Sequence, residues 1–473
     1  MIFSNLTDLH DALRSGKTTC VQLVHDALAR ADAAKDLNAF VEVFPESALA
    51  KAKQVDASLA SGTAGSLAGM VMAIKDNLSY AGHAMSASSK ILNNYTSPYT
   101  ATAVQRLLDA DAIILGRTGC DEFAMGSSNE TSFHGPVKNP VDPTKTPGGS
   151  SGGSASAVGA SIVQAALGTD TGGSIRQPAA FCGVYGSKPT YGRVSRYGAV
   201  AYASSFDQIG PLARSLEDMA AITQVIAGED AMDGTSSDRA VPEMFKPPQA
   251  KPMTFGYYPA VVDNPSLDPE IQSHFNRLKG ELEAAGHQMK PLAFDHLDSL
   301  VPIYYILTTA EASANLSRYD GMRYGHRAEG TEGLEDLYKS SRSEGFGAEV
   351  KRRIMLGTFV LSAGYFDAYY AKAQKARRMV RDATLSDLQG VDAIIGPTTP
   401  HTAFEIGLEH KDPTALYLED IFTVQAPIAG IPALSIPAGT HSNGLPYGWQ
   451  IMVDAFEDDK LFTMAMVMEA AQA

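Results

Sequence analysis

Residues 146–183 read TPGGSSGGSASAVGASIVQAALGTDTGGSIRQPAAFCG. Two glycine-serine turns, at 148–154 and 172–174, enclose an apolar run. Glycine lets the backbone adopt positive φ and lets other atoms approach closely, so glycines at both ends of an apolar segment indicate a site built from main chain. A flexible linker is disfavoured, because the Ala, Val, Ile and Leu between the glycines must be buried.

Two other interpretations of this stretch come from known glycine motifs. A phosphate-binding loop needs a lysine after its glycines, and the chain has none between Lys145 and Lys188. The pattern G-x-S-x-G, typical of a hydrolase nucleophile elbow, occurs twice, centred on Ser150 and Ser151. An elbow follows a strand, whereas the preceding NPVDPTKTPGG holds three prolines. Seven histidines lie downstream, so a Ser-His-Asp hydrolase stays open.

Lys75 is the candidate base for a serine in these turns. It ends the apolar run Val-Met-Ala-Ile at 71–74. A lysine at the end of a buried strand is desolvated, which disfavours the ammonium and brings its pKa toward that of a working base. The alternative is a lysine that reaches solvent or pairs with Asp76.

Lys75, the GGSSGGS at 148–154 and the GTDTGGSIRQP at 168–178 resemble the amidase signature family, in motif and in spacing. The resemblance implies a Ser–cis-Ser–Lys triad. In this sequence Ser174 would be the nucleophile and Lys75 the base, and Ser150 would bridge them after a cis peptide bond from Gly149.

The resemblance also implies an oxyanion hole and a fold. Main-chain N–H groups of Thr171, Gly172 and Gly173 would form the hole. The implied fold class is α/β, a large central mixed sheet covered by helices on both faces. We expect a single domain over 1–473, with N-terminal helices at 1–60, a catalytic core at 61–227, a loop at 228–252 and a second half at 253–473.

The second half is similar to one branch of that family, the glutamine-hydrolysing A-type subunits of tRNA-dependent amidotransferases. The similarity rests on RYDGMRYG at 318–325, EVKRRIMLG at 349–357 and LYLEDIFTV at 416–424. It implies that ammonia from glutamine passes to a partner that converts Glu-tRNA(Gln), Asp-tRNA(Asn) or both. The partners would be two further subunits, of B and C type, which hold the tRNA and use ATP and Mg; no cofactor or metal is expected in this chain.

The same similarity assigns substrate-binding residues. Arg353 would bind the α-carboxylate of glutamine, Asp420 its α-ammonium, and Tyr304 would line the site; a free amino acid needs one cation and one anion in this way. Each of the three has a neighbour of like type, so each assignment could belong to the adjacent residue instead. These neighbours are Arg352, Glu419 and Tyr305. The stretches MSASSK at 85–90 and VQAPIA at 424–429 depart from the family's usual pattern.

Bulk properties limit the function classes. The formal net charge of −15 disfavours direct binding to nucleic acid or to an anionic membrane. Three isolated cysteines predict a reducing compartment without disulfides or zinc. No signal peptide and no run of 18 apolar residues is visible. We therefore expect a cytoplasmic or organelle-matrix protein with no membrane contact.

The periodicity predicts the order of the elements. We expect helices through residues 1–60, with a capping box at Thr19 and Gln22, before a first strand at 69–74. A helix and a strand should follow at 98–117, then a loop at 121–140 in which His134 caps backbone groups. Beyond 253, strand-helix-strand alternation predicts an α/β sheet that continues the first half. Asp170 and Arg176 flank the second glycine turn and are expected to form an ion pair or to stabilise the turn, rather than to take part in the chemistry.

Two alternative functions remain at this point. One is a stand-alone amidase of the same family that acts on small amides, since the triad says nothing about the acyl group. The other is a non-catalytic scaffold subunit, for which replacement of Ser174 would leave the function intact.

Overall fold

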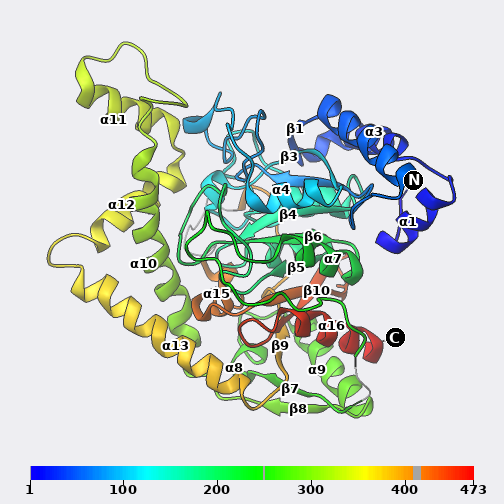
Figure 1. Ribbon diagram of the computed structural model, residues 1–473. Helices are drawn as coiled ribbons and strands as arrows, with labels where there is room; N and C mark the ends of the chain where they lie inside the picture. Colours follow the sequence, from blue (N-terminus) through cyan, green and yellow to red (C-terminus); the bar gives the residue numbers. More distant parts are fainter. Residues whose placement is uncertain (1, 249–250, 409–416, 473) are drawn as a thin grey trace.

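One mixed β-sheet runs through the molecule (Figure 1). The computed structural model describes residues 2–248, 251–408 and 417–472, and among these eleven strands pair into this sheet. In the order in which they lie side by side, the strands are β1 (Phe40–Val43), β3 (Ile113–Thr118), β2 (Val71–Lys75), β4 (Ala165–Asp170), β6 (Gln208–Ala213), β5 (Tyr185–Lys188), β10 (Ala433–Thr440), β11 (Pro446–Met452), β9 (Ala393–Pro397), β7 (Thr254–Tyr257) and β8 (Gln288–Pro291).

The sheet has two groups of parallel strands, with antiparallel strands between them and the antiparallel strand β1 at one edge. Strands β3, β2 and β4 are parallel, as are β9, β7 and β8. Antiparallel pairing of β5 with β10, in which Lys188 faces Ala433, joins the first half of the chain to the second. The two halves therefore share one sheet, and the predicted fold class is confirmed.

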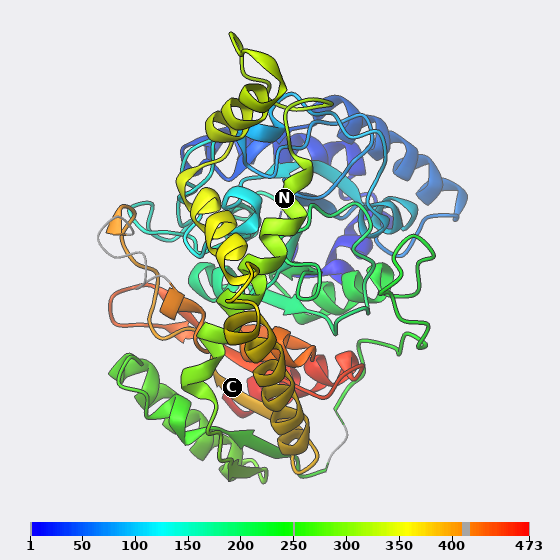
Figure 2. The ribbon, with the colours of Figure 1, turned by 90° about the vertical axis from the view of Figure 1, so that its left-hand side faces the viewer.

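Helices cover both faces of this sheet and extend beyond its edge (Figures 1 and 2). The helices of the first half are α1 (Leu6–Arg14), α2 (Cys20–Ala33), α3 (Pro45–Ser61), α4 (Thr102–Asp109), α5 (Gly152–Gly159), α6 (Arg176–Cys182) and α7 (Leu216–Ile226). Those of the second half are α8 (Pro259–Val262), α9 (Pro269–Ala284), α10 (Leu297–Asn315), α11 (Gly333–Gly345), α12 (Ala348–Val360), α13 (Lys372–Leu388), α15 (Gln425–Ala429) and α16 (Asp458–Gln472).

The central strands are buried throughout, because both of their faces are covered. All residues of β2, β4 and β6 are buried, the pattern expected for strands between two layers of helices. The short helices α5 and α6 lie inside the fold with nearly every residue buried. In contrast, α10, α12 and α13 run along one side of the molecule, on the left in Figure 1 and in front in Figure 2.

Several predicted elements are confirmed. The Thr19 hydroxyl caps α2 by accepting a hydrogen bond from the Gln22 N–H, at 3.1 Å. The helix and strand expected at 98–117 are α4 and β3, and the strand-helix-strand unit beyond 253 is β7, α9 and β8. The stretch 121–140 is a loop apart from one short 3₁₀ turn at Glu122–Ala124.

The expectation of helices alone through residues 1–60 is wrong. Residues Phe40–Val43 form β1, which pairs antiparallel with β3 at the edge of the sheet. Four residues are too few to show a strand period in the sequence. The pairing partner is about 75 residues away along the chain, so only the tertiary fold supplies the hydrogen bonds of this strand.

Candidate active site

The glycine-serine turns and Lys75 meet at one edge of the sheet. Strands β2 and β4 are parallel neighbours. Lys75 is the last residue of β2, and the turn that holds Ser174 directly follows β4. The other turn, with Ser150, lies immediately before α5. Because parallel strands end at the same edge, residues about 100 positions apart come together there.

The Lys75 side chain is fully buried among hydroxyl groups. Its Nζ lies 2.7 Å from Ser150 Oγ, 2.9 Å from Ser151 Oγ and 3.0 Å from Thr169 Oγ1. Burial lowers its pKa to about 8, although the nearby acidic groups partly oppose the shift. The alternative pairing with Asp76 does not occur, because Asp76 pairs with Arg117 at 2.5 Å. A buried amine with this pKa is a competent proton acceptor near neutral pH.

Ser150 follows a cis peptide bond from Gly149, as the family resemblance implies. Gly149 has no room for a side chain, since a Cβ there would overlap the Asp121 carboxylate. Its N–H donates to Gln177 Oε1 at 2.9 Å. Among the described residues, no histidine side chain hydrogen-bonds a serine of either turn, so nothing supports the Ser-His-Asp alternative.

The turn at 171–174 presents main-chain donors and a serine. Within the described part of the chain, the N–H groups of these four residues have no hydrogen-bond acceptor. Ser174 is 7% exposed, and its hydroxyl has no partner among the described residues. Gly173 adopts φ +147°, a conformation that favours glycine. Free N–H groups in a buried turn are suited to hold a developing negative charge.

A buried ion pair between Asp170 and Arg176 flanks this turn. Arg176 donates to both carboxylate oxygens of Asp170, each at 3.0 Å, and both side chains are fully buried. Burial alone would raise the pKa of Asp170, but the Arg176 guanidinium holds it below its usual value. The Ile175 N–H also donates to Asp170, at 3.2 Å. The predicted ion pair is confirmed.

Arg353 is the buried member of the basic run 351–353. Lys351 and Arg352 are exposed, whereas Arg353 is 4% exposed. Its Nε donates to Glu349 at 2.7 Å, and one Nη donates to the Tyr202 hydroxyl at 2.9 Å. Its second Nη has no partner among the described residues. The fold thus places Arg353, not Arg352, where a buried carboxylate could be bound.

Asp420 lies in a short 3₁₀ turn, Leu418–Asp420, and is 6% exposed. It accepts hydrogen bonds from the Tyr305 hydroxyl at 3.1 Å and from Ser127 at 3.3 Å. Burial raises its pKa to about 7, although the charge of Arg353 opposes this shift. Its neighbour Glu419 pairs with His401 at 2.7 Å instead.

Tyr304 and Tyr305 face different parts of the site. A Cβ placed on Gly172 would lie 2.6 Å from the Tyr304 hydroxyl, so Tyr304 packs on the turn that holds Ser174. Tyr305 contacts Asp420 and lies 5.2 Å from the Arg353 guanidinium. The two neighbours are therefore not exclusive alternatives, because Tyr304 contacts the serine turn and Tyr305 contacts the charged pair.

Hydrogen bonds connect the charged pair to both serine turns. Ser127, which donates to Asp420, accepts through its carbonyl from Gln177, and Gln177 holds Gly149. The Thr423 hydroxyl donates to the Gly172 carbonyl at 2.5 Å, and the Thr423 carbonyl accepts from Arg176 at 2.9 Å. Sequence reasoning missed the connecting roles of Ser127 and Thr423, because neither stands in a glycine motif.

The two stretches that depart from the family pattern form hydrogen bonds to residues outside the serine turns. Ser86 and Ser88, in the stretch 85–90, hydrogen-bond Asp76 and Cys120. Gln425, in the stretch 424–429, donates to Tyr258 and Thr384. The His134 ring bonds the Ser86 hydroxyl at 3.0 Å rather than backbone groups, which corrects its expected role as a backbone cap.

The described chain offers neither a metal site nor a membrane span. Among residues 2–248, 251–408 and 417–472, no three His, Cys, Asp or Glu side chains form a group that could hold a metal ion. In the same residues, no helix has the length and apolar character needed to cross a membrane.

Comparison with known proteins agrees with this geometry. The chain is 49% identical to the A-type subunit of the glutamyl-tRNA(Gln) amidotransferase of Prosthecochloris aestuarii, over 100% of this chain and 99% of that protein. A crystal structure of the corresponding protein from Thermotoga maritima matches with a TM-score of 0.78 and 38% identity, over 97% of this chain and 95% of that one. The native peptide amidase of Stenotrophomonas maltophilia matches with a TM-score of 0.83 and 30% identity, over 98% and 96%. The model of the family described as Amidase matches residues 22–462, and the chain belongs to this family.

Proposed function

We propose that this chain is the glutamine-hydrolysing subunit of a tRNA-dependent amidotransferase. The observation that carries the proposal is its 49% identity, over its whole length, to the A-type member of a glutamyl-tRNA(Gln) amidotransferase. The buried Arg353 and Asp420 support it, because they offer the opposite charges that a free amino acid needs.

The chemistry would proceed through Lys75, Ser150 and Ser174. Neutral Lys75 takes a proton from Ser150, which takes one from Ser174, and Ser174 attacks the side-chain amide carbon of glutamine. The described hydrogen bonds end at Ser150, 2.7 Å from Lys75. Rotation of the unpartnered Ser174 hydroxyl about χ1, a fast motion, would complete the relay.

The remaining steps use the same groups. The N–H groups of Thr171, Gly172 and Gly173 hold the oxyanion of each tetrahedral intermediate. The relay returns the proton to the departing nitrogen, which leaves as ammonia. Water then cleaves the ester on Ser174 and releases glutamate.

Arg353 and Asp420 would orient the substrate. The free Nη of Arg353 would donate to the α-carboxylate, and ionised Asp420 would accept from the α-ammonium. Tyr304, between this pair and the turn of Ser174, would direct the side-chain amide toward the nucleophile.

The ammonia would pass to partner subunits, two of B and C type, that use ATP and Mg and hold the tRNA. The net charge of −15 supports this division, since a chain of this net charge repels a polyanion at long range. The complex would act in the cytoplasm or in an organelle matrix.

One experiment tests the proposal against a stand-alone amidase. The purified chain, alone and with co-purified partners, is given glutamine and a series of small and peptide amides, and ammonia release is measured. We expect glutamine to be the preferred amide and mass spectrometry to find a trapped acyl group on Ser174. Faster turnover of simple amides, or an acyl group on another serine, would contradict it.

A further inference from the structure

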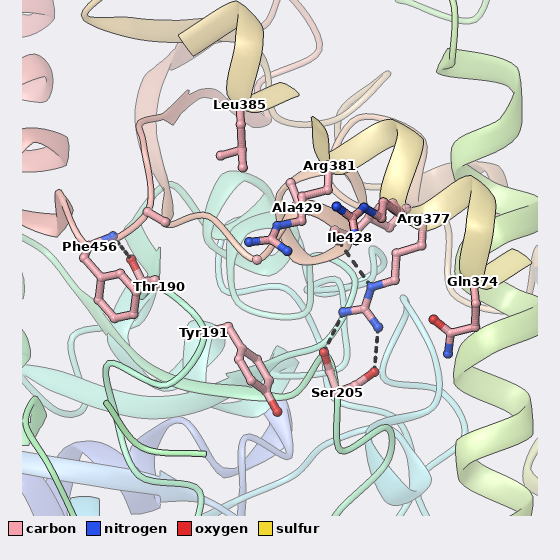
Figure 3. Close-up of a pocket in the computed structure, with 13 residues that line it drawn as sticks. Thr190, Tyr191, Ser205, Gln374, Arg377, Arg381, Leu385, Ile428, Ala429 and Phe456 are labelled. Atoms are coloured by element: carbon pink, nitrogen blue, oxygen red, sulfur yellow. Dashed lines mark hydrogen bonds between the residues drawn. The ribbon is translucent and has the colours of Figure 1, made fainter. Parts of the chain in front are cut away.

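A cavity whose lining contains none of the serine-turn residues opens beside helix α13 (Figure 3). Its volume is about 520 Å³, within the range of pockets that hold small molecules. Three arginines line it, Arg377, Arg378 and Arg381, and its lining includes no aspartate or glutamate. Apolar groups of Leu385, Ile428 and Phe456 form other parts of the wall.

The arginines belong to a basic stretch in an otherwise acidic chain. Residues 372–381 of α13 hold five lysines and arginines and no acidic residue, whereas the chain has a net charge of −15. A concave surface with one sign of charge attracts ligands of the opposite sign. The local charge therefore favours an anionic ligand.

Arg377 is already fixed in the wall of this cavity. One Nη donates to the Ser205 hydroxyl at 2.7 Å and the other to the Ser205 carbonyl at 2.8 Å (Figure 3). The guanidinium also lies 4.0 Å from the centre of the Phe206 ring. A cation fixed in this way loses little side-chain entropy when a ligand arrives. Burial lowers the pKa of Arg377, the Glu311 carboxylate opposes this shift, and the charge of Arg381 adds to it.

Arg381 is the cation without a partner. Among the described residues it has no hydrogen bond and no ion pair, and Figure 3 shows it reaching from α13 toward Ala429. Arg378 has only an exposed ion pair with Asp382, at 3.4 Å. The Glu311 carboxylate, which accepts a hydrogen bond from the Ser205 hydroxyl, partly offsets the charge of Arg377. The charge of Arg381 still opposes that of Arg377, and an anion between the two arginines would reduce this repulsion.

We propose that this cavity binds a small molecule that carries a phosphate group beside an apolar or aromatic portion. Guanidinium groups pair with phosphate through two parallel hydrogen bonds, and the apolar wall would hold the uncharged portion. The concave shape favours a small molecule over an RNA backbone, which prefers an open basic surface. The proposal does not depend on the activity proposed for Ser174.

The test measures binding by titration calorimetry with the full-length chain at low salt and without Mg. The probes are ATP, inorganic phosphate, adenosine and unfractionated tRNA. We expect ATP to bind, inorganic phosphate to compete with it, and adenosine alone to bind at least about tenfold more weakly, since it lacks the charged group. Absence of binding by both phosphate-bearing small molecules would overturn the proposal.

Matched variants locate the site. Arg381→Gln removes the unpartnered cation, and Lys375→Gln removes the same charge from an exposed position on α13 outside the cavity. We expect Arg381→Gln to weaken ATP binding at least about tenfold and Lys375→Gln to leave it within about twofold, as for a surface charge. Equal losses in both variants, or binding of tRNA in preference to ATP, would show an open basic face and overturn the proposal. Thermal unfolding of each variant confirms that it is folded.

Discussion

The serine turns and the charged pair Arg353–Asp420 are built in different ways. Lys75, Ser150 and Ser174 sit at the ends of neighbouring strands or in turns close to them, and main chain supplies much of the site. Arg353 and Asp420 are single side chains on α12 and on a separate 3₁₀ turn. The first region can be recognised in a contiguous motif, whereas the second exists only after α10, α12 and the turn at 418–420 have packed together.

This difference bears on what distinguishes relatives within the family. The peptide amidase has a higher TM-score to this chain than the Thermotoga maritima protein, 0.83 against 0.78, although its identity is lower, 30% against 38%. Overall fold therefore does not separate the two kinds of protein. If the serine turns carry out the chemistry and the charged pair selects the substrate, changes in the turns should alter mainly kcat, whereas changes in the pair should alter mainly KM.

The largest effect is expected from Ser174→Ala. Loss of the nucleophile should lower kcat for glutamine by roughly 10⁴-fold or more, while glutamine binding is kept. The control is Ser156→Ala, a buried serine on α5 that donates to the Lys138 carbonyl at 2.9 Å, outside the site. Steady-state ammonia release measures both. Substantial activity in Ser174→Ala would favour the scaffold alternative.

Lys75 should determine the pH dependence of kcat/KM. The ammonium cannot accept a proton and its pKa is about 8, so kcat/KM should rise with pH up to about 8 and level off above it. Lys75→Met should lower kcat by about 10²- to 10⁴-fold and remove this ionisation. A profile that falls between pH 6 and pH 8 would exclude Lys75 as the base.

Arg353→Gln tests whether the charged pair Arg353–Asp420 binds the substrate. Loss of one charged hydrogen bond to the α-carboxylate should raise KM for glutamine about 10- to 100-fold and change kcat much less. Arg352→Gln is the matched control, because Arg352 is exposed on the same helix. If the two variants behave alike, the assignment to position 353 is wrong.

Asp420 should give KM its own pH dependence. Its pKa of about 7 leaves the carboxyl half protonated near neutral pH, and only the carboxylate can pair with the α-ammonium of glutamine. KM should therefore fall as the pH rises through about 7, and Asp420→Asn should raise KM about tenfold, as for a lost charged hydrogen bond. A KM independent of pH in the wild type would refute this role.

The smallest effect is expected from Tyr305→Phe. It removes the hydroxyl that donates to Asp420 at 3.1 Å, and the loss of one hydrogen bond should raise KM by about two- to tenfold. Tyr304→Phe serves as the comparison, since Tyr304 packs on Gly172 and does not contact Asp420 through an observed hydrogen bond. A larger KM effect from Tyr304 would make it the residue that positions Asp420.

Some of the structure could be predicted from short patterns. The capping box at Thr19, the unit β7-α9-β8 and the pair Asp170–Arg176 are local, so neighbouring residues specify them. Strand β1 could not be predicted, because its partner β3 lies far away in the sequence. The choice between Arg352 and Arg353 was also beyond the sequence, since both are arginines on one helix and only packing buries one of them.

By itself, the sequence determined the family and the candidate nucleophile, bridging serine and base, because glycine-rich turns need particular residues at particular places. Only the tertiary structure decided that Arg353 rather than Arg352 is buried, that Tyr305 contacts Asp420, and that Ser127 and Thr423 connect the charged pair to the serine turns. It also brought the arginines of α13 together with Ser205 and Ile428 around a cavity. Such contacts join residues that are distant along the chain, and their burial depends on helices packing against a completed sheet.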